Sequence, residues 1–335
     1  MKKKKHILIK STVTVLAVSI ILQCSGIAPR KAANVYQRFF FHEVWGYLMK
    51  GEEKEITGRE PFTDVLYFGV TLNEEGRIVG SSDRPDLNFK DKKPRMHLVV
   101  YKHSDPSLLH ICLTKNHPAR NNLIEGIASC SAQFDGIQLD FETLRPDDGL
   151  ALLDLLSEIR HRVPDKILSV AVPARVKKLE NDAYDYSALS SIADKIVVMA
   201  YDEHWKTSSP GPVASVSWCK SIADHATDTI PPDKLVMGLP LYGRAWPATD
   251  LYRSMKYRQI DEKLKTPSIA QKRNSGKEPY FEYEQSVTVK VFYEDMDSIH
   301  AKLRLYKSYG IHGVAFWRIG QGPDELWDTI LIGSR

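Results

Sequence analysis

Short apolar runs alternate with amphipathic segments along most of this chain. The runs have the length and the β-branched and aromatic content of strands, and they cover residues 43–48, 64–70, 108–114, 134–142, 166–173, 195–202, 234–242 and 313–319. Apolar residues at helical spacing predict helices at 121–131, 147–163, 186–193, 215–226, 295–309 and 324–331. A turn at 73–76 with an apolar return at 77–80 predicts one small hairpin. This order of elements predicts a parallel sheet covered by helices.

Eight strands separated mostly by helices favour a (β/α)8 barrel, the TIM barrel of α/β proteins. A doubly wound open sheet is the alternative, and it is disfavoured because no glycine-rich phosphate loop follows the first strand. We expect one barrel domain over residues 43–335, preceded by a spacer over residues 25–42. The segment 245–290 is too short for a large addition, so we expect little or no inserted α/β lobe and a shallow groove.

The stretch FDGIQLDFE, residues 134–142, combines strand alternation with paired acids. Its apolar side chains fall on one face, and Gln138, Asp140 and Glu142 fall on the other. In a buried strand, two carboxylates two residues apart cannot both ionise easily, so one tends to hold a proton. A carboxyl group that holds a proton near neutral pH can serve as a general acid. The stretch therefore indicates an active site.

Other polar and aromatic residues stand at the ends of predicted strands. The carboxyl ends of barrel strands meet at one face, where active sites of this fold lie. Four strand ends contribute Glu142, Tyr201, Asp202, Tyr242, Arg244 and Trp317. The histidines, such as His204, show no metal-ligand spacing, so we expect neither a metal site nor another cofactor.

The N-terminus has the composition of an export signal. Residues 1–10 are basic and residues 13–22 are mostly apolar, a run too short for a comfortable membrane span. The sequence ILQC at 21–24 resembles a bacterial lipoprotein cleavage box, in which Cys24 would be lipidated and anchor the chain to a membrane. Gln23 replaces the usual small residue, so a plain cleaved signal or an uncleaved anchor are alternatives. We expect an exported protein at the cell envelope, with residues 1–24 as the signal.

Charge and cysteine content narrow the remaining function classes. The net charge is +4, and the N-terminal lysines supply five positive charges, so the rest of the chain is close to neutral. This balance gives no support for nucleic-acid binding. Cys112, Cys130 and Cys219 are widely spaced without a CxxC pair, so we expect buried free thiols or a single bridge.

Four stretches resemble motifs of glycoside hydrolase family 18, the chitinase-like barrels. DGIQLDFE at 135–142 resembles the D-G-x-D-x-D-x-E signature, and MAYD at 199–202 resembles the M-x-Y-D motif. GLPLYGR at 238–244 and GVAFW at 313–317 are similar to the seventh- and eighth-strand motifs. The resemblance runs from about Val44 to Ile330.

The resemblance implies a retaining mechanism in which the 2-acetamido oxygen of the substrate attacks the anomeric carbon. It assigns proton donation and water activation to Glu142, orientation of the acetamido group to Asp140, and a hydrogen bond to the acetamido oxygen to Tyr201. The implied partner is a β-1,4-linked N-acetylglucosamine polymer, either chitin or the glycan strands of peptidoglycan. We expect the chain to act as a monomer.

The resemblance also implies a set of substrate contacts. Asp202 would bind sugar near the cleavage point, and Trp317 would form the floor under the distorted ring. The resemblance assigns substrate contacts less specifically to Tyr47, Tyr242 and Arg244.

Two departures from the family pattern matter. Gln138 stands among the substrate-binding residues where the family usually has an inward Asp that shares a proton with its neighbour. An amide cannot take up that proton, so we expect Asp140 to stay ionised and to pair with Glu142, with a lower rate and a changed pH profile. The family's small-residue motif of the third strand is also not recognisable at 108–115.

Three functions remain open on this basis. The first is glycan hydrolysis, the second is a catalytically weak or silent sugar-binding protein on the same barrel, and the third is a barrel enzyme that does not act on sugars. Such binding proteins usually lose the acid, whereas Glu142 is present. Peptidoglycan-acting members can carry an amide at the position of Gln138, which together with the export signal favours cell-wall glycan over chitin.

Overall fold

The computed structural model describes residues 36–89, 93–247, 255–277 and 279–333. The chain divides into two compact units, Met1–Tyr36 and Gln37–Arg335, and every element below belongs to the second. The predicted signal over residues 1–24, its Cys24 and most of the predicted spacer lie outside the described residues. Among the described helices, none combines the length and the apolar character needed to cross a membrane.

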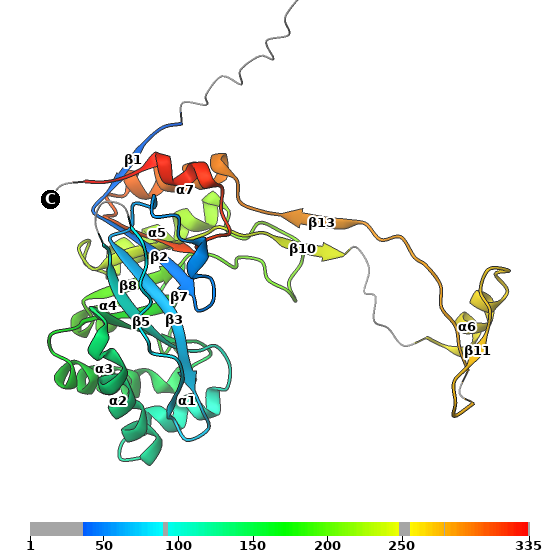
Figure 1. The fold of residues 1–335 in the computed structure, drawn as a ribbon, viewed down its shortest axis with the longest axis horizontal. Helices are drawn as coiled ribbons and strands as arrows, with labels where there is room; N and C mark the ends of the chain where they lie inside the picture. Colours follow the sequence, from blue (N-terminus) through cyan, green and yellow to red (C-terminus); the bar gives the residue numbers. More distant parts are fainter. Residues whose placement is uncertain (1–35, 90–92, 248–254, 278, 334–335) are drawn as a thin grey trace, which may run out of the picture. The chain divides into compact units, whose positions relative to one another are not determined.

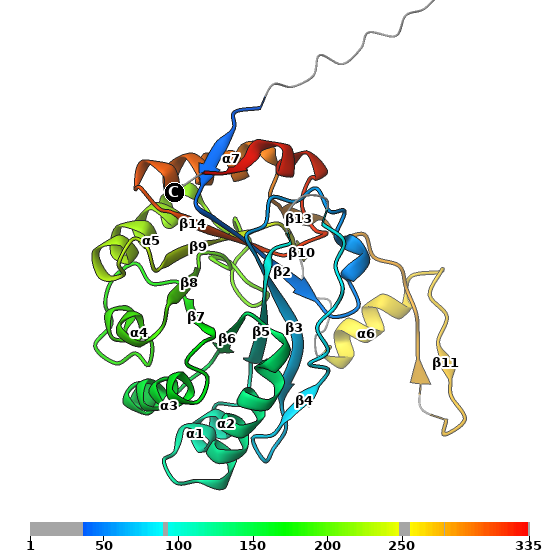
Figure 2. The same cartoon turned by 60° about the vertical axis from the view of Figure 1, so that its left-hand side comes forward.

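Within the described residues, eight parallel strands close into a barrel (Figures 1 and 2). They are β2 (Glu43–Met49), β3 (Asp64–Leu72), β5 (Arg95–Lys102), β6 (Gly136–Phe141), β7 (Ile167–Pro173), β8 (Lys195–Met199), β9 (Leu235–Pro240) and β14 (Gly313–Trp317). The sheet closes because β2 pairs with both β14 and β3. The short β4 (Ile78–Gly80) pairs antiparallel with β3, as the hairpin signal predicted. The (β/α)8 barrel is therefore confirmed.

Helices lie around the outside of the strands (Figure 2). They are α1 (Pro106–Leu113), α2 (Pro118–Cys130), α3 (Gly149–Arg162), α4 (Tyr186–Ile192), α5 (Val216–Thr229) and α7 (Met296–Ser308). Each of α4, α5 and α7 begins after an Asp or Ser whose side chain accepts a hydrogen bond from the first turn. Helix α3 shows why these segments pack inward, because its leucines at 152, 155 and 156 form one buried stripe.

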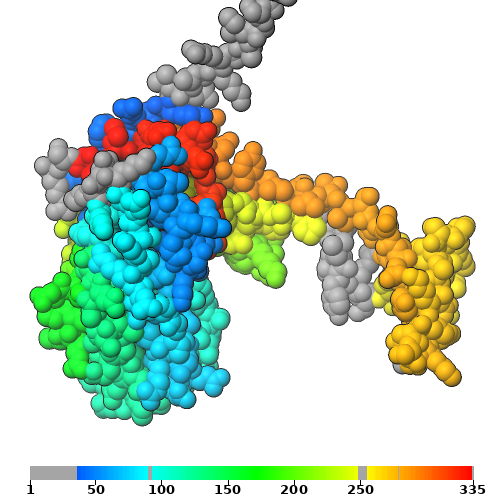
Figure 3. Space-filling view, in the orientation of Figure 1, coloured from blue at the N-terminus to red at the C-terminus, as the bar shows by residue number. Residues whose placement is uncertain are grey.

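The interior of the barrel is filled by alternate residues of the strands. The buried cluster comprises Trp45, Tyr47, Leu66, Phe68, Val99, Val197, Val236 and Ala315. Because successive side chains of a strand point to opposite faces, the same alternation directs the other half of each strand toward the helices. Figure 3 shows the first half of this unit, coloured blue to green, as closely packed atoms. The polar residues of the site stand above this apolar layer.

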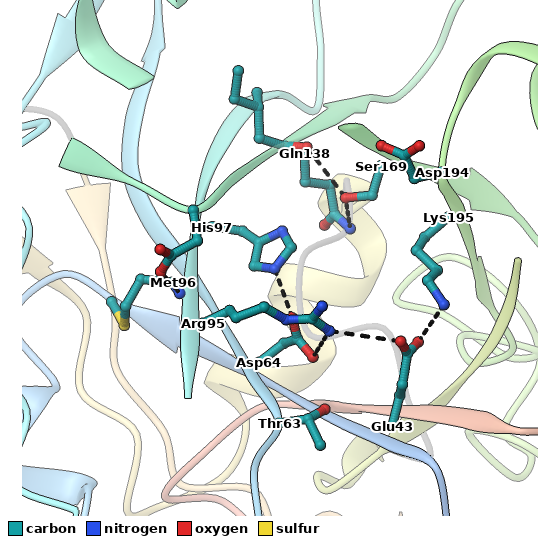
Figure 4. Close-up of polar contacts among 12 residues, drawn as sticks. Glu43, Thr63, Asp64, Arg95, Met96, His97, Gln138, Ser169, Asp194 and Lys195 are labelled. Atoms are coloured by element: carbon teal, nitrogen blue, oxygen red, sulfur yellow. Dashed lines mark hydrogen bonds and ion pairs between the residues drawn. The ribbon is translucent and has the colours of Figure 1, made fainter. Parts of the chain in front are cut away.

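Buried charges join the amino ends of the strands (Figure 4). Lys195 Nζ lies 2.6 Å from Glu43 Oε2. Arg95 donates to both oxygens of Asp64 at 2.8 and 2.9 Å, and His97 Nε2 lies 2.8 Å from the same carboxylate. Burial opposes ionisation of Asp64, but the hydrogen bonds from His97 and Arg95 hold its pKa below the usual value. The network therefore stabilises the closed end of the barrel.

The predicted third strand at 108–114 is wrong, because this segment forms helix α1. A six-residue apolar run is ambiguous between strand and helix. The deciding signals lie upstream, where the Asp105 side chain accepts from Leu108 N and Pro106 occupies the first turn. The third strand of the barrel is β5, so the motif comparison at 108–115 was made at the wrong place.

The chain termini of this unit also differ from the prediction. The predicted helix at 324–331 is a 3-10 helix, Asp324–Thr329, followed by β15 (Ile330–Ile332). Strand β15 pairs in parallel with β1 (Phe39–Phe41), which lies within the predicted spacer. The last residues of that spacer are therefore part of the folded unit, since the apolar Phe39 and Phe41 are buried. Three more 3-10 segments occur at Glu53–Glu55, Ser131–Gln133 and Pro146–Asp148.

The segment after β9 carries small elements. Strands β10 (Arg244–Pro247) and β13 (Val289–Phe292) pair antiparallel. Between them lie α6 (Tyr257–Leu264) and the hairpin of β11 (Lys272–Arg273) with β12 (Pro279–Tyr280). Helix α6 has no buried residue, which agrees with the prediction of little or no inserted α/β lobe.

The three described cysteines are free thiols. Cys112 and Cys219 are buried, and Cys130 is partly buried. Burial raises the pKa of the Cys112 and Cys219 thiols to about 11, so they stay protonated near neutral pH. The three cysteines therefore agree with the expectation of free thiols and not with that of a disulfide bridge.

Candidate active site

A pocket of about 520 Å³ opens at the carboxyl ends of the strands. Its lining residues are Tyr47, His103, Asp140, Glu142, Met199, Tyr201, Asp202, Tyr242, Gly243, Arg244, Trp317, Arg318 and Gln321. Eight of the nine residues that the sequence analysis assigned to a site lie in this lining. The ninth, Gln138, is fully buried and precedes Asp140 by two positions on β6.

Strand β6 delivers the two acids. Its alternation directs Gln138 and Asp140 inward, and the backbone N–H of Glu142 continues the pairing by donating to Lys102 O at 2.9 Å. Asp140 is only 4% exposed. Burial, followed by the negative charge of Asp140, raises the pKa of Glu142 to about 7. Glu142 can therefore both donate and accept a proton near neutral pH.

Gln138 is held by two neighbouring strands. Its Oε1 accepts a hydrogen bond from the Tyr47 hydroxyl at 2.8 Å. Its Nε2 donates to Ser169 Oγ at 3.3 Å (Figure 4). Both ends of the amide are therefore engaged. Among the described residues, Oδ1 of Asp140 is buried without a hydrogen-bond partner. The amide thus does not replace the proton-sharing neighbour that an aspartic acid would supply.

His103 is a site residue that the sequence analysis missed. Its Nε2 lies 3.3 Å from Asp140 Oδ2 and 3.8 Å from Glu142 Oε1. The hydrogen bond to Asp140 is the main cause that raises the pKa of His103. The signal was present in the sequence, because His103 immediately follows the strand 95–102, which was assigned to no element.

A metal ion could be held by the same three side chains. The ligand atoms of His103, Asp140 and Glu142 all lie within 4.8 Å of one another. Spacing along the sequence could not detect this group, because its members come from two strands. The contacts of His103 with the two acids already satisfy these atoms in part.

Asp202 organises a second group on the pocket wall. Its Oδ1 accepts hydrogen bonds from the Tyr242 hydroxyl and from Arg244 Nε and Nη2, the last two at 2.9 and 2.6 Å. Asp202 has φ of 62°, in the left-handed region that Asp tolerates better than most residues. The group links the end of β8 to the segment that follows β9.

Tyr201 depends on a glycine of the neighbouring strand. A Cβ atom at Gly238 would come within 2.9 Å of the Tyr201 ring and 2.8 Å of Val198 O. Burial raises the pKa of the Tyr201 hydroxyl well above its usual value, so this group remains a hydrogen-bond donor. The GLPLYGR motif therefore serves partly to make room for the tyrosine of the MAYD motif.

Trp317 ends β14 at the pocket. Its ring meets Tyr47 and Phe68 edge to face, with centroid separations of 5.3 and 5.0 Å. The next residue, Arg318, lines the pocket and places Nη2 2.8 Å from Glu52 Oε1. Sequence reasoning did not single out Arg318, which carries no motif of its own.

A barrel whose fourth strand ends in a protonatable carboxyl group, beside a buried carboxylate and a tryptophan of the pocket lining, has the arrangement of a glycosidase of the (β/α)8 class. Residues 101–322 match the family model described as "Glycosyl hydrolases family 18", and the chain belongs to this family. It is therefore a glycosidase of a family that acts on N-acetylglucosamine-containing glycans.

Relatives agree with this assignment. The uncharacterized glycosylase YvbX of Bacillus subtilis (strain 168) is 27% identical over 293 residues, which cover 82% of this chain and 84% of YvbX. The cortical fragment-lytic enzyme of Bacillus anthracis is 27% identical over 293 residues, covering 81% of this chain and 68% of that enzyme. The crystal structure of the Bacillus cereus spore cortex-lytic enzyme SleL shares the fold with a TM-score of 0.66 at 21% identity, covering 89% of this chain and 76% of SleL.

Proposed function

We propose that this chain hydrolyses β-1,4-linked N-acetylglucosamine-containing glycans with retention of anomeric configuration and with help from the substrate's own acetamido group. The observation that carries the proposal is the contrast between two neighbouring acids. Glu142 is half-buried at the pocket with a pKa of about 7, whereas Asp140 is 4% exposed. Glu142 is suited to transfer protons, and Asp140 is suited to stabilise charge.

In the first step Glu142 donates its proton to the glycosidic oxygen while the acetamido oxygen attacks the anomeric carbon. The bond to the leaving sugar breaks, and an oxazolinium ion forms. Asp140 faces the acetamido N–H and balances the positive charge, and Tyr201 donates a hydrogen bond to the acetamido oxygen. In the second step the Glu142 carboxylate takes a proton from water while the water oxygen attacks the anomeric carbon. The bond between that carbon and the acetamido oxygen breaks, which opens the oxazolinium ring and restores the acetamido group.

A protein nucleophile is disfavoured by the state of the pocket carboxylates. Asp140 is buried and faces His103, and Oδ1 of Asp202 accepts from Tyr242 and Arg244. Glu142 is needed as the acid, so the lining offers no carboxylate free to attack the sugar. This arrangement supports attack by the acetamido group.

The remaining lining residues bind sugar in this proposal. Trp317 forms the floor under the distorted ring, because it lines the pocket and is held there by Tyr47 and Phe68. Tyr47 also holds Gln138, which shapes the bottom of the site. The group of Asp202, Tyr242 and Arg244 offers donors and an acceptor to hydroxyl groups near the cleavage point.

We propose peptidoglycan glycan strands as the substrate, with chitin as the alternative. Two observations support this choice. Relatives that cover most of this chain include proteins named cortical fragment-lytic enzyme. Peptidoglycan-acting members of the family can also carry an amide at the position of Gln138.

We further propose that residues 1–24 direct export to the cell envelope, with lipidation of Cys24 as one form of anchoring, and that the protein acts as a monomer. The barrel domain is proposed to span residues 43–335, extended by β1 at Phe39–Phe41, which pairs with β15. Treatment of the cell envelope with detergent, followed by mass spectrometry of the mature N-terminus, tests the signal and the anchor.

The decisive experiment compares the native protein with Glu142→Gln and a surface control, Glu74→Gln. Each is incubated with chitooligosaccharides and with peptidoglycan, and products are identified by mass spectrometry and their anomers by NMR. We expect cleavage of peptidoglycan with retention, unchanged in the control and reduced at least about 10²-fold in Glu142→Gln. Equal cleavage of a substrate without its acetamido group would contradict substrate assistance. Binding without cleavage by the native protein would favour the sugar-binding alternative.

A further inference from the structure

His103 stands beside the two acids because of strand register. Strands β5 and β6 pair in parallel, with Tyr101 opposite Asp140 and Lys102 opposite Phe141. His103, the residue that follows β5, therefore lies beside Glu142 at the mouth of the pocket. The rings of Tyr101 and Phe68 lie 4.8 and 6.2 Å from the imidazole and limit its orientations. Its side chain is 42% exposed, so protons can exchange with solvent.

The amide of Gln138, on the barrel-interior side of Asp140, does not share a proton with the Asp140 carboxylate. The amide oxygen of Gln138 accepts a hydrogen bond from Tyr47, and the amide nitrogen donates one to Ser169. Oδ1 of Asp140 has no hydrogen-bond partner among the described residues, while Oδ2 has His103 at 3.3 Å. The partner of this carboxylate is therefore on its solvent side.

We propose that His103 is a positioning residue of the hydrolytic reaction. Its imidazolium, 3.3 Å from Oδ2, orients the Asp140 carboxylate from the solvent side, in place of the contact that an inner aspartic acid at position 138 would make. This inference rests on the proposed function, because it assigns Asp140 and Glu142 the roles given above. It replaces our expectation that Asp140 pairs mainly with Glu142.

The charges of His103, Asp140 and Glu142 cancel in the protonation state from which the proposed reaction begins. Protonated His103, ionised Asp140 and protonated Glu142 sum to zero before the reaction. When Glu142 gives up its proton, the imidazolium lies 3.8 Å away and offsets the new negative charge. Among the described residues, the other titratable or charged groups near this part of the pocket are Tyr47, Tyr101, Tyr184, Tyr201, Asp202, Tyr242, Arg244 and Arg318.

Removal of the imidazolium makes Glu142 harder to ionise. The positive charge of His103 lowers the pKa of Glu142 against the larger effects of burial and Asp140, so its loss raises that pKa further. The alkaline limb of a bell-shaped pH–rate profile, where Glu142 loses its proton, should therefore move to higher pH.

The first test is the pH profile of kcat/KM for the native protein, His103→Gln and His103→Lys. We expect His103→Gln to shift the alkaline limb upward by about one pH unit and to lower kcat more than it raises KM. His103→Lys, which restores a positive charge, should move this limb back toward its native position. His161→Gln, an exposed histidine of α3, serves as the matched control. A His103→Gln profile that superimposes on the native one overturns the proposal.

The second test needs no turnover and separates this proposal from the proposed function. The pKa of the His103 imidazole is measured by NMR titration in the native protein and in Asp140→Asn. We expect the imidazole pKa to fall in the variant, since Asp140 is the main cause that raises it. An equal pKa in both proteins overturns the link between His103 and Asp140, whether or not the protein cleaves a glycan.

Discussion

The hydroxyl of Tyr47 on β2 donates a 2.8 Å hydrogen bond to Oε1 of Gln138 on β6, across the interior of the barrel. Both side chains are buried, so the bond fixes which end of the amide faces each neighbour. The nitrogen end is directed to Ser169. The residue that departs from the family motif is thus integrated into the core beneath the acids.

Gln138→Asp should restore a proton-sharing pair with Asp140. Two carboxyl groups at this spacing in a buried site hold one proton between them, so the titration of the site changes. We expect an altered pH–rate profile and a higher kcat, measured by reducing-sugar release across pH 4–9. Gln138→Asn keeps the amide and is the control. An unchanged profile in Gln138→Asp would contradict the assigned role of the amide.

Glu142 should make folding stability decrease as pH rises. Its pKa in the folded protein is about 7, above the ordinary value of 4.5, so the folded state binds more protons than the unfolded state between these values. Stability contributed by the protonated form is therefore lost between pH 4.5 and 7. Urea unfolding at pH 4.5, 6 and 7.5 should show this fall in the native protein and a weaker fall in Glu142→Gln. Parallel curves for the two proteins would refute the assignment.

Tyr201→Phe should lower kcat by about 10-fold or more with little change in stability, since it removes one hydrogen bond aimed at developing charge. The ring packs beside Gly238, and phenylalanine keeps that packing. Activity and urea midpoints of the variant are compared with those of the native protein. If kcat is unchanged, the hydroxyl has no part in the reaction.

Lys195→Ala should destabilise the closed end of the barrel. It removes the cation 2.6 Å from the buried Glu43, which keeps Arg95 at 3.6 Å. Breaking a buried pair in this way costs about 3 kcal/mol of unfolding free energy. The double variant Glu43→Leu with Lys195→Met should recover most of the loss in urea unfolding. Further loss in the double variant would show that the charges have another role.

Chelation should leave hydrolysis unchanged. His103, Asp140 and Glu142 could surround a metal ion, but the proposed reaction uses all three without one. Activity is measured after dialysis against EDTA and again after addition of Zn²⁺ or Mn²⁺. Loss of activity on dialysis, with recovery on addition of metal, would overturn the metal-free mechanism.

The sequence was informative wherever local periodicity and motif spacing carry the answer. Alternation in residues 134–142 placed Asp140 and Glu142 on one face of β6, and the structure agrees. Seven of the eight predicted barrel strands overlap observed ones, because buried parallel strands are rich in β-branched and aromatic residues. The third failed because LLHICL satisfies a strand pattern and a helix pattern equally well.

By itself the sequence determined the barrel, the family resemblance and the acids at the end of the fourth strand, since each depends on short-range pattern. Only the tertiary structure decided which side chains surround those acids. His103 reaches Asp140 through the register of β5 on β6, and Tyr47 reaches Gln138 across 91 positions of the chain. Such contacts depend on barrel closure, which brings strands distant in sequence within hydrogen-bonding distance.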